Sequence, residues 1–144
     1  MTGVQTCALP ISSKVSLKQR IKTFPESFFV AQADDKIIGI INGCIINATV
    51  INDKLYKDSK LHNPNGDYQT IFGLDVIPDY RNRGIAAQLM NYMIEVSIVA
   101  GRKGVILTCK HKLIHYYTKF GYVNKGISAS VHGGAKWYDM ILEF

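Results

Sequence analysis

The stretch from Tyr68 to Gly101 constrains the fold more than any other part of the chain, because it reads as a strand, a short loop and a helix in succession. Residues 68–77 are rich in β-branched and aromatic side chains and are followed by Pro78, so a strand is expected to end at Ile77. The next apolar residues recur at the spacing of one helix face: Ile85, Leu89, Met93 and Val96. The pattern predicts a helix over Arg83–Ala100, closed by Gly101.

The other predicted elements alternate between strands and helices on either side of this unit. Strands are expected at Phe28–Ala33, Lys36–Ile46, Gly104–Cys109, Tyr122–Val131 and Trp137–Phe144, and helices at Ser16–Phe24 and Leu113–Phe120. Asp34 and Asp35 join the first two strands in a hairpin, and the polar segment Asn47–Asp67 is a long connection. The order α-β-β-β-α-β-α-β-β predicts an α/β (α+β) fold, a mixed sheet with helices on its faces.

The composition is that of one globular domain. The chain has 144 residues, 47% hydrophobic and 19% charged, and no apolar run approaches the roughly 20 residues that span a bilayer. The net charge of +6 suits an anionic ligand, but the basic residues are scattered without interleaved aromatics, which argues against nucleic-acid binding. The three cysteines, Cys7, Cys44 and Cys109, show no paired spacing and favour a reduced, cytoplasmic compartment.

The first eleven residues differ in character from the rest. Met1–Ile11 carries no charge and has neither helical nor strand periodicity, and it lacks the basic start of a signal peptide. The run from Thr2 to Ile11 resembles the translation of a sequencing-library adapter. We therefore expect residues 1–11 to be non-native and the domain to comprise residues 12–144, with an ordinary disordered terminus as the alternative.

The segment Arg81–Ala86, between the predicted strand and helix, has the features of an anion site. A helix N-terminus leaves unpaired N–H groups and is the positive end of the helix dipole. Gly84 and Ala86 are small enough for a diphosphate to approach these amides, and Arg81 and Arg83 add positive charge. The segment is neither a Walker loop nor the three-glycine dinucleotide fingerprint. The alternative is a glycine near a helix start beside two solvated arginines.

Two motifs resemble those of the GNAT superfamily of N-acetyltransferases. Arg81–Ala86 matches the pattern Arg/Gln-x-x-Gly-x-Gly/Ala, after a strand that ends in Leu74-Asp75-Val76-x-Pro78. Further on, Tyr117–Tyr122 is similar to the pattern Tyr-x-x-Phe-Gly-Phe/Tyr. The resemblance covers about Ser16–Phe144. It implies a GNAT fold with a mixed, mostly antiparallel sheet whose N-terminal strand and helix are missing here, acetyl-CoA as co-substrate, and no metal.

Within the superfamily the chain most resembles arylalkylamine (serotonin) N-acetyltransferases and their bacterial relatives, on Leu61–Pro64, Leu113-Ile114 and Ser128–Met140. This resemblance implies transfer of an acetyl group from acetyl-CoA to the primary amine of a small acceptor, with arylalkylamines among the candidates. Two alternatives remain open: a protein-lysine or N-terminal acetyltransferase, and a CoA-binding module without turnover. Neither a membrane nor a nucleic acid is expected as a partner, and a homodimer is left open.

The resemblance also implies roles for individual residues. The backbone of Leu74 and Val76 is expected to pair with the pantetheine arm as an added strand would. The pyrophosphate is expected at the loop and the helix start, at Arg81, Asn82, Arg83, Gly84, Ile85 and Ala86. The Val76 amide is the expected oxyanion donor, and Tyr117 the expected acid for the departing thiolate. The alternative for Tyr117 is a core aromatic on a short helix. Tyr116 and Tyr117 point about 100° apart around a helix, so only one of them can face a given cleft, and the Phe-Gly motif selects Tyr117.

The proton acceptor for the amine is left unassigned. An alkyl amine is mostly protonated at neutral pH, because its pKa is near 10 as in lysine. The two positions at which animal arylalkylamine enzymes place histidines are Thr70 and Phe72 here, and neither takes a proton at neutral pH. Asp75 has the opposite strand parity and is expected to face away from both, unless a bulge redirects it.

Four histidines and a cysteine are the remaining candidates for proton transfer or nucleophilic chemistry. His62 and His132 lie in turn-rich segments that could border a cleft, although a surface histidine is the commoner case. His111 and His115 are expected to be solvated. Cys109 ends a buried strand beside the expected cleft. A covalent acetyl-cysteine would need an adjacent base that the sequence does not identify, so packing is favoured for Cys109.

Overall fold

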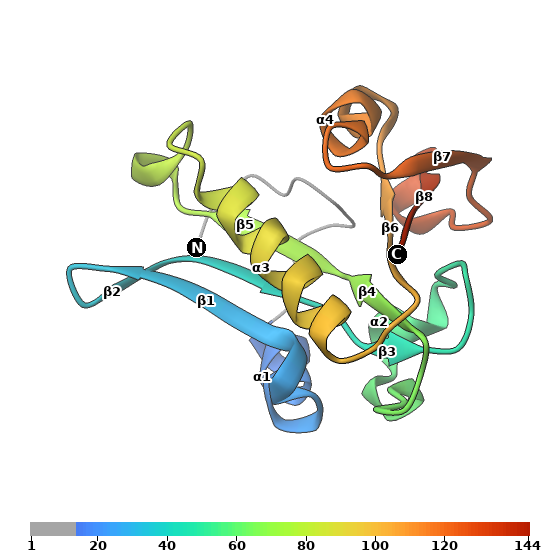
Figure 1. Ribbon diagram of the computed structural model, residues 1–144, viewed down its shortest axis with the longest axis horizontal. Helices are drawn as coiled ribbons and strands as arrows, with labels where there is room; N and C mark the ends of the chain where they lie inside the picture. Colours follow the sequence, from blue (N-terminus) through green and yellow to red (C-terminus); the bar gives the residue numbers. More distant parts are fainter. Residues whose placement is uncertain (1–13) are drawn as a thin grey trace.

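The computed structural model describes the backbone of residues 14–144 and the side chains from Lys18 onward except that of His132 (Figure 1). The predicted non-native segment, residues 1–11, lies outside this range. The helices are α1 (Lys14–Thr23), α2 (Lys54–Lys57), α3 (Ile85–Val99) and α4 (Ile114–Thr118). The strands are β1 (Phe28–Ala33), β2 (Lys36–Asn42), β3 (Ile45–Ile46), β4 (Tyr68–Ile71), β5 (Gly73–Val76), β6 (Gly104–Cys109), β7 (Val123–Ile127) and β8 (Tyr138–Glu143).

The strands form two sheets, one of three strands and one of five. The first has the order β1-β2-β5 and is antiparallel throughout. The second has the order β3-β4-β6-β8-β7, in which β4 and β6 are parallel and the other neighbours are antiparallel. Helix α3 lies on the crossover that the parallel pair requires. The predicted mixed, mostly antiparallel sheet with flanking helices is confirmed.

Two strands that the sequence predicts as continuous are each divided between the sheets. The expected strand 68–77 is interrupted at Phe72, so that β4 joins the five-stranded sheet and β5 the three-stranded sheet. The expected strand Lys36–Ile46 is interrupted after Asn42 in the same way, giving β2 and β3. The two breaks lie side by side. The backbones are so close there that a Cβ atom at Gly43 would clash with the carbonyl oxygen of Thr70. Only glycine allows this close approach of two backbones.

Helix α3 begins two residues later than expected, at Ile85 instead of Arg83. Asn82 and Gly84 have φ angles of 61° and 79°, in the left-handed region, and therefore cannot belong to a right-handed helix. Gly84 is consequently the residue that directly precedes the helix. Glycine adopts this conformation without the steric cost that a Cβ atom imposes.

The other helical boundaries also differ modestly from expectation. The expected helix Leu113–Phe120 is a 3₁₀ turn (His111–Leu113) followed by α4, and Gly121 with a φ of 104° ends the segment. The connection expected over Asn47–Asp67 contains α2 and a 3₁₀ turn at Ser59–Leu61. Among the described residues, no helix combines the length and apolar character needed to cross a membrane.

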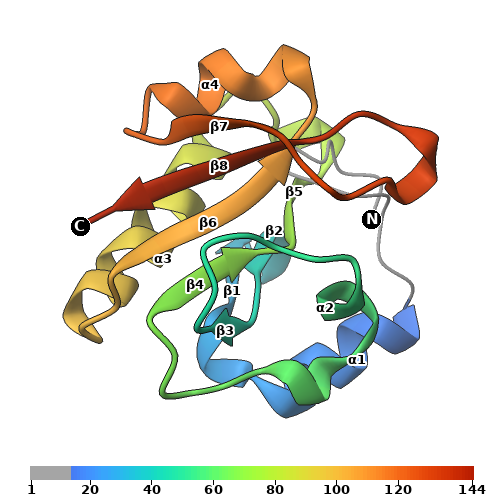
Figure 2. The same ribbon diagram turned by 90° about the vertical axis from the view of Figure 1, so that its right-hand side faces the viewer.

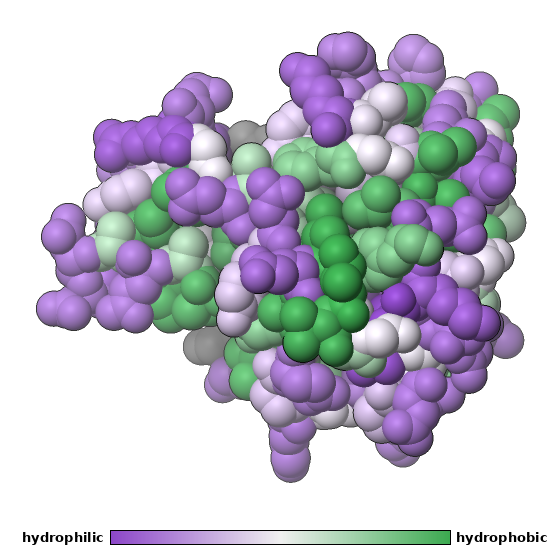
Figure 3. Space-filling view, in the orientation of Figure 1, coloured by the Kyte–Doolittle hydropathy of each residue, from purple (hydrophilic) through white to green (hydrophobic). Residues whose placement is uncertain are grey.

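Helix α3 covers one face of the sheets, whereas α1 and α2 lie on the opposite side (Figures 1 and 2). The α3-side cluster of buried apolar residues is Ile41, Ile71, Leu74, Leu89, Met90, Met93, Val105, Leu107, Cys109, Tyr117, Tyr122, Trp137 and Met140. The α1-side cluster is Phe24, Cys44, Ile46, Ile51, Leu55, Tyr68, Phe72, Ile106 and Ile141. On the outer surface of α3, apolar residues remain exposed (Figure 3), among them Ile98 and Val99.

The sheet opens between β5 and β6. Strands β4 and β6 are paired from Tyr68 and Gly104 to Ile71 and Leu107. Beyond that point β5 pairs with β2, whereas β6 continues alongside β8. Within residues 14–144, β2 is the sole strand that pairs with β5. The loop that leads to α3 leaves from the end of β5, so the helix N-terminus lies beside this opening.

Candidate cofactor-binding and active site

The loop between β5 and α3 is tied to the strand that precedes it. A 3₁₀ turn over Pro78–Tyr80 follows β5, and the Arg81 backbone that comes next is extended. Arg81 Nε donates a hydrogen bond of 3.1 Å to the carbonyl oxygen of Val76. At Gly84 an added Cβ atom would meet no atom within 4 Å. The loop therefore turns sharply and leaves open space directly in front of α3.

The N-terminus of α3 presents three backbone N–H groups that precede the hydrogen-bond ladder of the helix. The first bond of that ladder runs from Gln88 N to Gly84 O, at 3.0 Å, so the amides of Ile85, Ala86 and Ala87 come before it. The N-cap residue is Gly84, which has no side chain with which to cap these amides. Because α3 is 15 residues long, its dipole makes this end positive.

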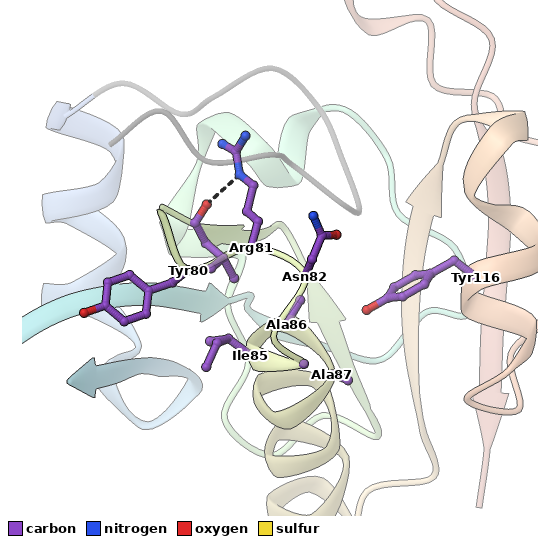
Figure 4. A pocket seen from close by; sticks show the side chains of 9 residues that line it. Tyr80, Arg81, Asn82, Ile85, Ala86, Ala87 and Tyr116 are labelled. Atoms are coloured by element: carbon purple, nitrogen blue, oxygen red, sulfur yellow. Dashed lines mark hydrogen bonds between the residues drawn. The ribbon is translucent and has the colours of Figure 1, made fainter. Parts of the chain in front are cut away.

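These amides border a cavity of about 300 Å³ (Figure 4). Its lining residues are Val76, Tyr80, Arg81, Asn82, Gly84, Ile85, Ala86, Ala87 and Tyr116. Apart from Arg83, every loop and helix-start residue that the sequence predicts at the pyrophosphate site is in this set. The guanidinium of Arg83 instead lies 5.0 Å from the centre of the Tyr80 ring. A cavity with an arginine and a helix N-terminus in its wall suits an anion.

Three lining residues were not expected from the sequence. Ala87 continues the run of small side chains that begins with Ala86, and that run was an available signal. Tyr80 and Tyr116 come from the 3₁₀ turn and from α4, and only the folded chain brings them to the same cavity. Figure 4 shows Tyr116 extending from α4 with its hydroxyl end directed toward the loop.

The backbone of β5 presents two residues to the opening of the sheet. Ile77 N donates a hydrogen bond of 2.9 Å to the carbonyl oxygen of Ile38 on the neighbouring strand β2. Because N–H and C=O groups alternate in direction along a strand, those of Val76 and Leu74 face away from β2. The bond from Arg81 to the Val76 carbonyl agrees with this direction. Both residues that the sequence predicts to pair with an extended ligand thus face the side where β6 parts from β5.

The two adjacent tyrosines of α4 face different surroundings. Tyr117 is fully buried in the α3-side cluster, which also contains Leu74 of β5 and Cys109 of β6. Its ring centre lies 5.1 Å from that of Tyr116 and 5.9 Å from that of Tyr122. Tyr116 is half-buried and lines the cavity beside α3. Tyr116 therefore borders the cavity at the helix N-terminus, whereas Tyr117 belongs to a buried cluster that includes residues of both β5 and β6.

Asp75 faces the opposite side from the one that simple strand alternation predicts. Phe72 N donates to Asn42 O at 2.7 Å, and Gly73 is also paired with Asn42, so two residues lie opposite one. This is the arrangement of a β-bulge, and it shifts the alternation by one residue. Leu74 consequently packs in the α3-side cluster, and Asp75 points to the same face as Phe72.

The environment of Asp75 makes its carboxyl group unusually basic. Burial raises the pKa of Asp75 to about 6, and the positive charge of Arg81 offsets part of that rise. A carboxylate in this range is largely ionised at neutral pH and still basic enough to accept a proton. Thr70 and Phe72 lie on the same face and are buried, and neither side chain can accept a proton at neutral pH. The Thr70 hydroxyl donates a hydrogen bond of 2.9 Å to the Cys44 carbonyl oxygen.

His62 has a structural position. Its Nδ1 accepts a hydrogen bond of 3.0 Å from the Ile45 backbone N–H, so the proton of the neutral ring lies on Nε2. Nε2 in turn lies 2.9 Å from Glu26 Oε1, and the ring packs 5.1 Å from that of Phe24. Both ring nitrogens are therefore engaged in holding β3 to the segment after α1.

Of the remaining candidates that the structure describes, two histidines are solvated and the cysteine is unreactive. His111 and His115 are exposed, as expected, and the side chain of His132 lies outside the described part of the structure. Cys109 is fully buried, and this burial raises the pKa of its thiol to about 12. The thiolate needed for a covalent acetyl-cysteine is thus scarce at neutral pH. In the part of the chain that the structure describes, no cluster of His, Cys, Asp and Glu is arranged to hold a metal.

The fold and the cavity at the N-terminus of α3 are those expected of an acetyltransferase domain of the GNAT type. The model of the acetyltransferase (GNAT) family matches residues 5–122, and the chain belongs to this family.

Two curated relatives match shorter stretches. The uncharacterized N-acetyltransferase YkwB of Bacillus subtilis (strain 168) is 31% identical over 93 residues, which cover 60% of this chain and 41% of the relative. A protein of Oryza sativa subsp. japonica named "probable glucosamine 6-phosphate N-acetyltransferase 2" is 35% identical over 60 residues, covering 40% of this chain and 36% of the relative. The matches thus span less than half the length of either relative.

Solved structures of low sequence identity share the fold. A GNAT-like decarboxylase, GphF, in complex with isobutyryl-CoA has a TM-score of 0.74 and 18% identity, covering 93% of this chain and 86% of its own. The NatC complex bound to Gag peptide and CoA has a TM-score of 0.69 and 16% identity, covering 93% and 81%. At such identities the likeness supports the architecture and says nothing of the acceptor.

Proposed function

We propose that this domain transfers the acetyl group of acetyl-CoA to the primary amine of a small acceptor, by direct attack of the amine on the thioester. The observation that carries the proposal is the juxtaposition of the α3 N-terminus with the outward-facing backbone of β5. One supplies N–H groups for a diphosphate, and the other supplies a strand edge for an extended chain. Both features border one cavity, whose lining residues include Val76 of β5 and Ile85, Ala86 and Ala87 of α3.

The residues at the helix start fit the diphosphate of CoA. The open space at Gly84 admits phosphate oxygens close to the backbone, and the alanines that follow add little bulk. The amides of Ile85, Ala86 and Ala87 precede the helical ladder and can donate to those oxygens. In this proposal Arg81 and Asn82 complete the wall, and Arg83 acts through its charge and its backbone amide.

The residues of β5 and α4 have separate roles in the proposed reaction. The backbone of Leu74 and Val76 holds the pantetheine arm at the outer edge of β5. The Val76 N–H faces the opening and donates to the oxyanion that develops on the acetyl oxygen. Tyr117 transfers its hydroxyl proton to the departing thiolate. Its membership of one buried cluster with Leu74 and Cys109 supports a place at the junction of β5 and β6.

The acceptor is proposed from the sequence motifs, with a small arylalkylamine or related primary amine as the first candidate. The named relatives include a glucosamine 6-phosphate N-acetyltransferase, whereas the NatC structure contains a peptide. A peptide acceptor is therefore the second candidate. A cytoplasmic location and a homodimer also remain predictions.

The proposal is tested by a rate screen with acetyl-CoA as the donor. Arylalkylamines, simple alkylamines, amino sugars and short peptides with a free N-terminus are each incubated with the protein, and release of the CoA thiol is followed. The proposal predicts amine-dependent thiol release and a matching acetylated small amine by mass spectrometry. Acetylation of peptides alone would select the second candidate. Calorimetric binding of acetyl-CoA without transfer to any acceptor would support a CoA-binding module and reject the proposal.

A further inference from the structure

The bulge at Phe72 creates a polar patch on the face of β5 opposite α3. The patch consists of Asn42, Gly73 and Asp75, which lie on adjacent strands and point the same way. A Cβ atom placed on Gly73 would lie 3.2 Å from Asn42 Nδ2 and 3.9 Å from Asp75 Oδ2. The absence of a side chain at Gly73 therefore lets the amide and the carboxylate approach the same point on β5.

Two polar atoms of this patch are buried and have no hydrogen-bond partner among the described residues. Asp75 is 8% exposed and Asn42 is 1% exposed, yet Asp75 Oδ1 and Asn42 Nδ2 make no bond there. The Asn42 side chain is oriented by Arg20, whose Nη1 donates to Asn42 Oδ1 at 3.2 Å. Buried polar atoms in native proteins are nearly always satisfied, so a pair of this kind calls for a partner from outside the described residues.

The buried carboxylate of the patch suits an amine as its partner. Asp75 offers a buried acceptor oxygen that an ammonium group can satisfy, and it is adjacent in sequence to Val76, the proposed oxyanion donor. The positive groups on the surrounding elements are Arg81, after β5, and Arg20, on α1. Arg81 is bonded to the Val76 carbonyl, and Arg20 acts on the patch through Asn42. The charge of Arg81 favours the ionised carboxylate, whereas burial opposes it.

We propose that Asp75 is the catalytic base that takes the proton from the acceptor ammonium, so that the acceptor enters from the α1 side of the sheet. This inference rests on the proposed acetyl transfer. The ammonium N–H bond breaks, and its proton moves to Asp75 Oδ1. The nitrogen lone pair then forms the new bond to the acetyl carbon, and the C–S bond breaks as the thiolate takes the proton of Tyr117. The attacking nitrogen then gives up a second proton, which restores the Tyr117 hydroxyl by way of solvent and leaves a neutral amide. After transfer, Asp75 returns its proton to solvent.

A pH profile distinguishes this role from a structural one. The ionised carboxylate is the active form, so kcat/KM of the wild type for an alkylamine rises as pH increases to about 6, near the pKa of Asp75, and then levels. In Asp75→Asn the reaction depends on the neutral amine in solution. At neutral pH kcat/KM therefore falls by about 10²–10⁴-fold, the usual effect of losing a general base, and keeps rising toward the pKa of the amine.

Two comparisons complete the test. An amine that is already neutral at pH 7, such as trifluoroethylamine, is expected to react with Asp75→Asn nearly as fast as with the wild type. The matched control is Asp139→Asn, which removes another carboxyl group whose pKa is raised by burial. It is expected to keep the wild-type profile.

Equal profiles for the wild type and Asp75→Asn, or loss of the acidic limb in Asp139→Asn alone, would overturn the inference while leaving acetyl transfer intact. A wild type that binds acetyl-CoA and acetylates no amine would instead reject the proposed function. Unchanged calorimetric affinity for CoA in both variants shows that the fold is preserved. If Asp75→Asn does not fold, Asp75→Glu supplies the comparison. Moving the carboxylate by one methylene is expected to lower kcat/KM while keeping the acidic limb, and an unchanged kcat/KM would contradict the role.

Discussion

Replacement of Gly84 by valine separates the cost of backbone strain from the loss of ligand binding. Gly84 has a φ of 79°. A residue with a Cβ atom in the left-handed region costs about 1–2 kcal/mol. For a domain of about this size that corresponds to a fall in Tm of roughly 2–8 °C. Because a Cβ atom at Gly84 meets nothing within 4 Å, no clash adds to this cost.

The effect of Gly84→Val on CoA affinity is expected to be larger than its effect on stability. The valine side chain would fill the open space through which phosphate oxygens reach the helix amides. Hydrogen bonds to charged groups contribute about 1.5–3 kcal/mol each, so loss of two of them costs about 3–6 kcal/mol. This corresponds to an increase in Kd on the order of 10²–10⁴-fold, since each 1.4 kcal/mol is tenfold.

Gly101 provides a matched control at the opposite end of α3. Its φ is also 79°, and an added Cβ atom there also meets nothing within 4 Å. Gly101→Val should therefore lower Tm by a similar amount. Because α3 has 15 residues at about 1.5 Å each, the two ends are roughly 22 Å apart. Calorimetry with CoA should then show wild-type affinity for Gly101→Val. Equal affinities for Gly84→Val and the wild type would refute the assignment of the phosphate site.

Three further substitutions test individual residues of the site. Tyr117→Phe is expected to lower kcat by at least tenfold with little change in acetyl-CoA affinity, because the hydroxyl acts on the leaving thiolate. The control Tyr116→Phe should leave kcat within about twofold. If Tyr116→Phe instead lowers kcat more than Tyr117→Phe does, the acid role belongs to Tyr116. Cys109→Ala is expected to retain turnover, and an acetylated cysteine in the mass spectrum of the quenched wild type would contradict direct transfer. His62→Ala should lower the free energy of unfolding by about 1–3 kcal/mol, because the buried Ile45 N–H loses its acceptor. If thermal melts of His62→Ala match the wild type while turnover is lost, the structural role of His62 is wrong.

The features that depend on neighbouring residues could be predicted from the sequence. Pro78, Gly84 and the apolar period that follows are local signals, and they located the loop and helix α3 to within two residues. The order of strands and helices also followed from local patterns. These signals are strong because strand ends, helix starts and left-handed positions are set largely by the residues that occupy them.

The features that depend on distant pairing could not be read in the same way. The division of the strand at Phe72 arises because Asn42 of β2 lies opposite both Phe72 and Gly73, and this reverses the face of Asp75. A glycine within a strand is a weak signal of such a bulge, and Gly73 carried that signal. The role of His62 likewise depends on Glu26 and Ile45, which are 36 and 17 residues away.

The most direct measurement of the central claim is the response of backbone amides to CoA. In a nuclear magnetic resonance titration of nitrogen-labelled protein, the largest shifts are expected at Ile85, Ala86 and Ala87, with further shifts at Val76. The amide of Gly101, at the other end of α3, should remain unchanged. A titration in which CoA binds while the chemical shifts of the amides at the start of α3 stay unchanged would contradict the account.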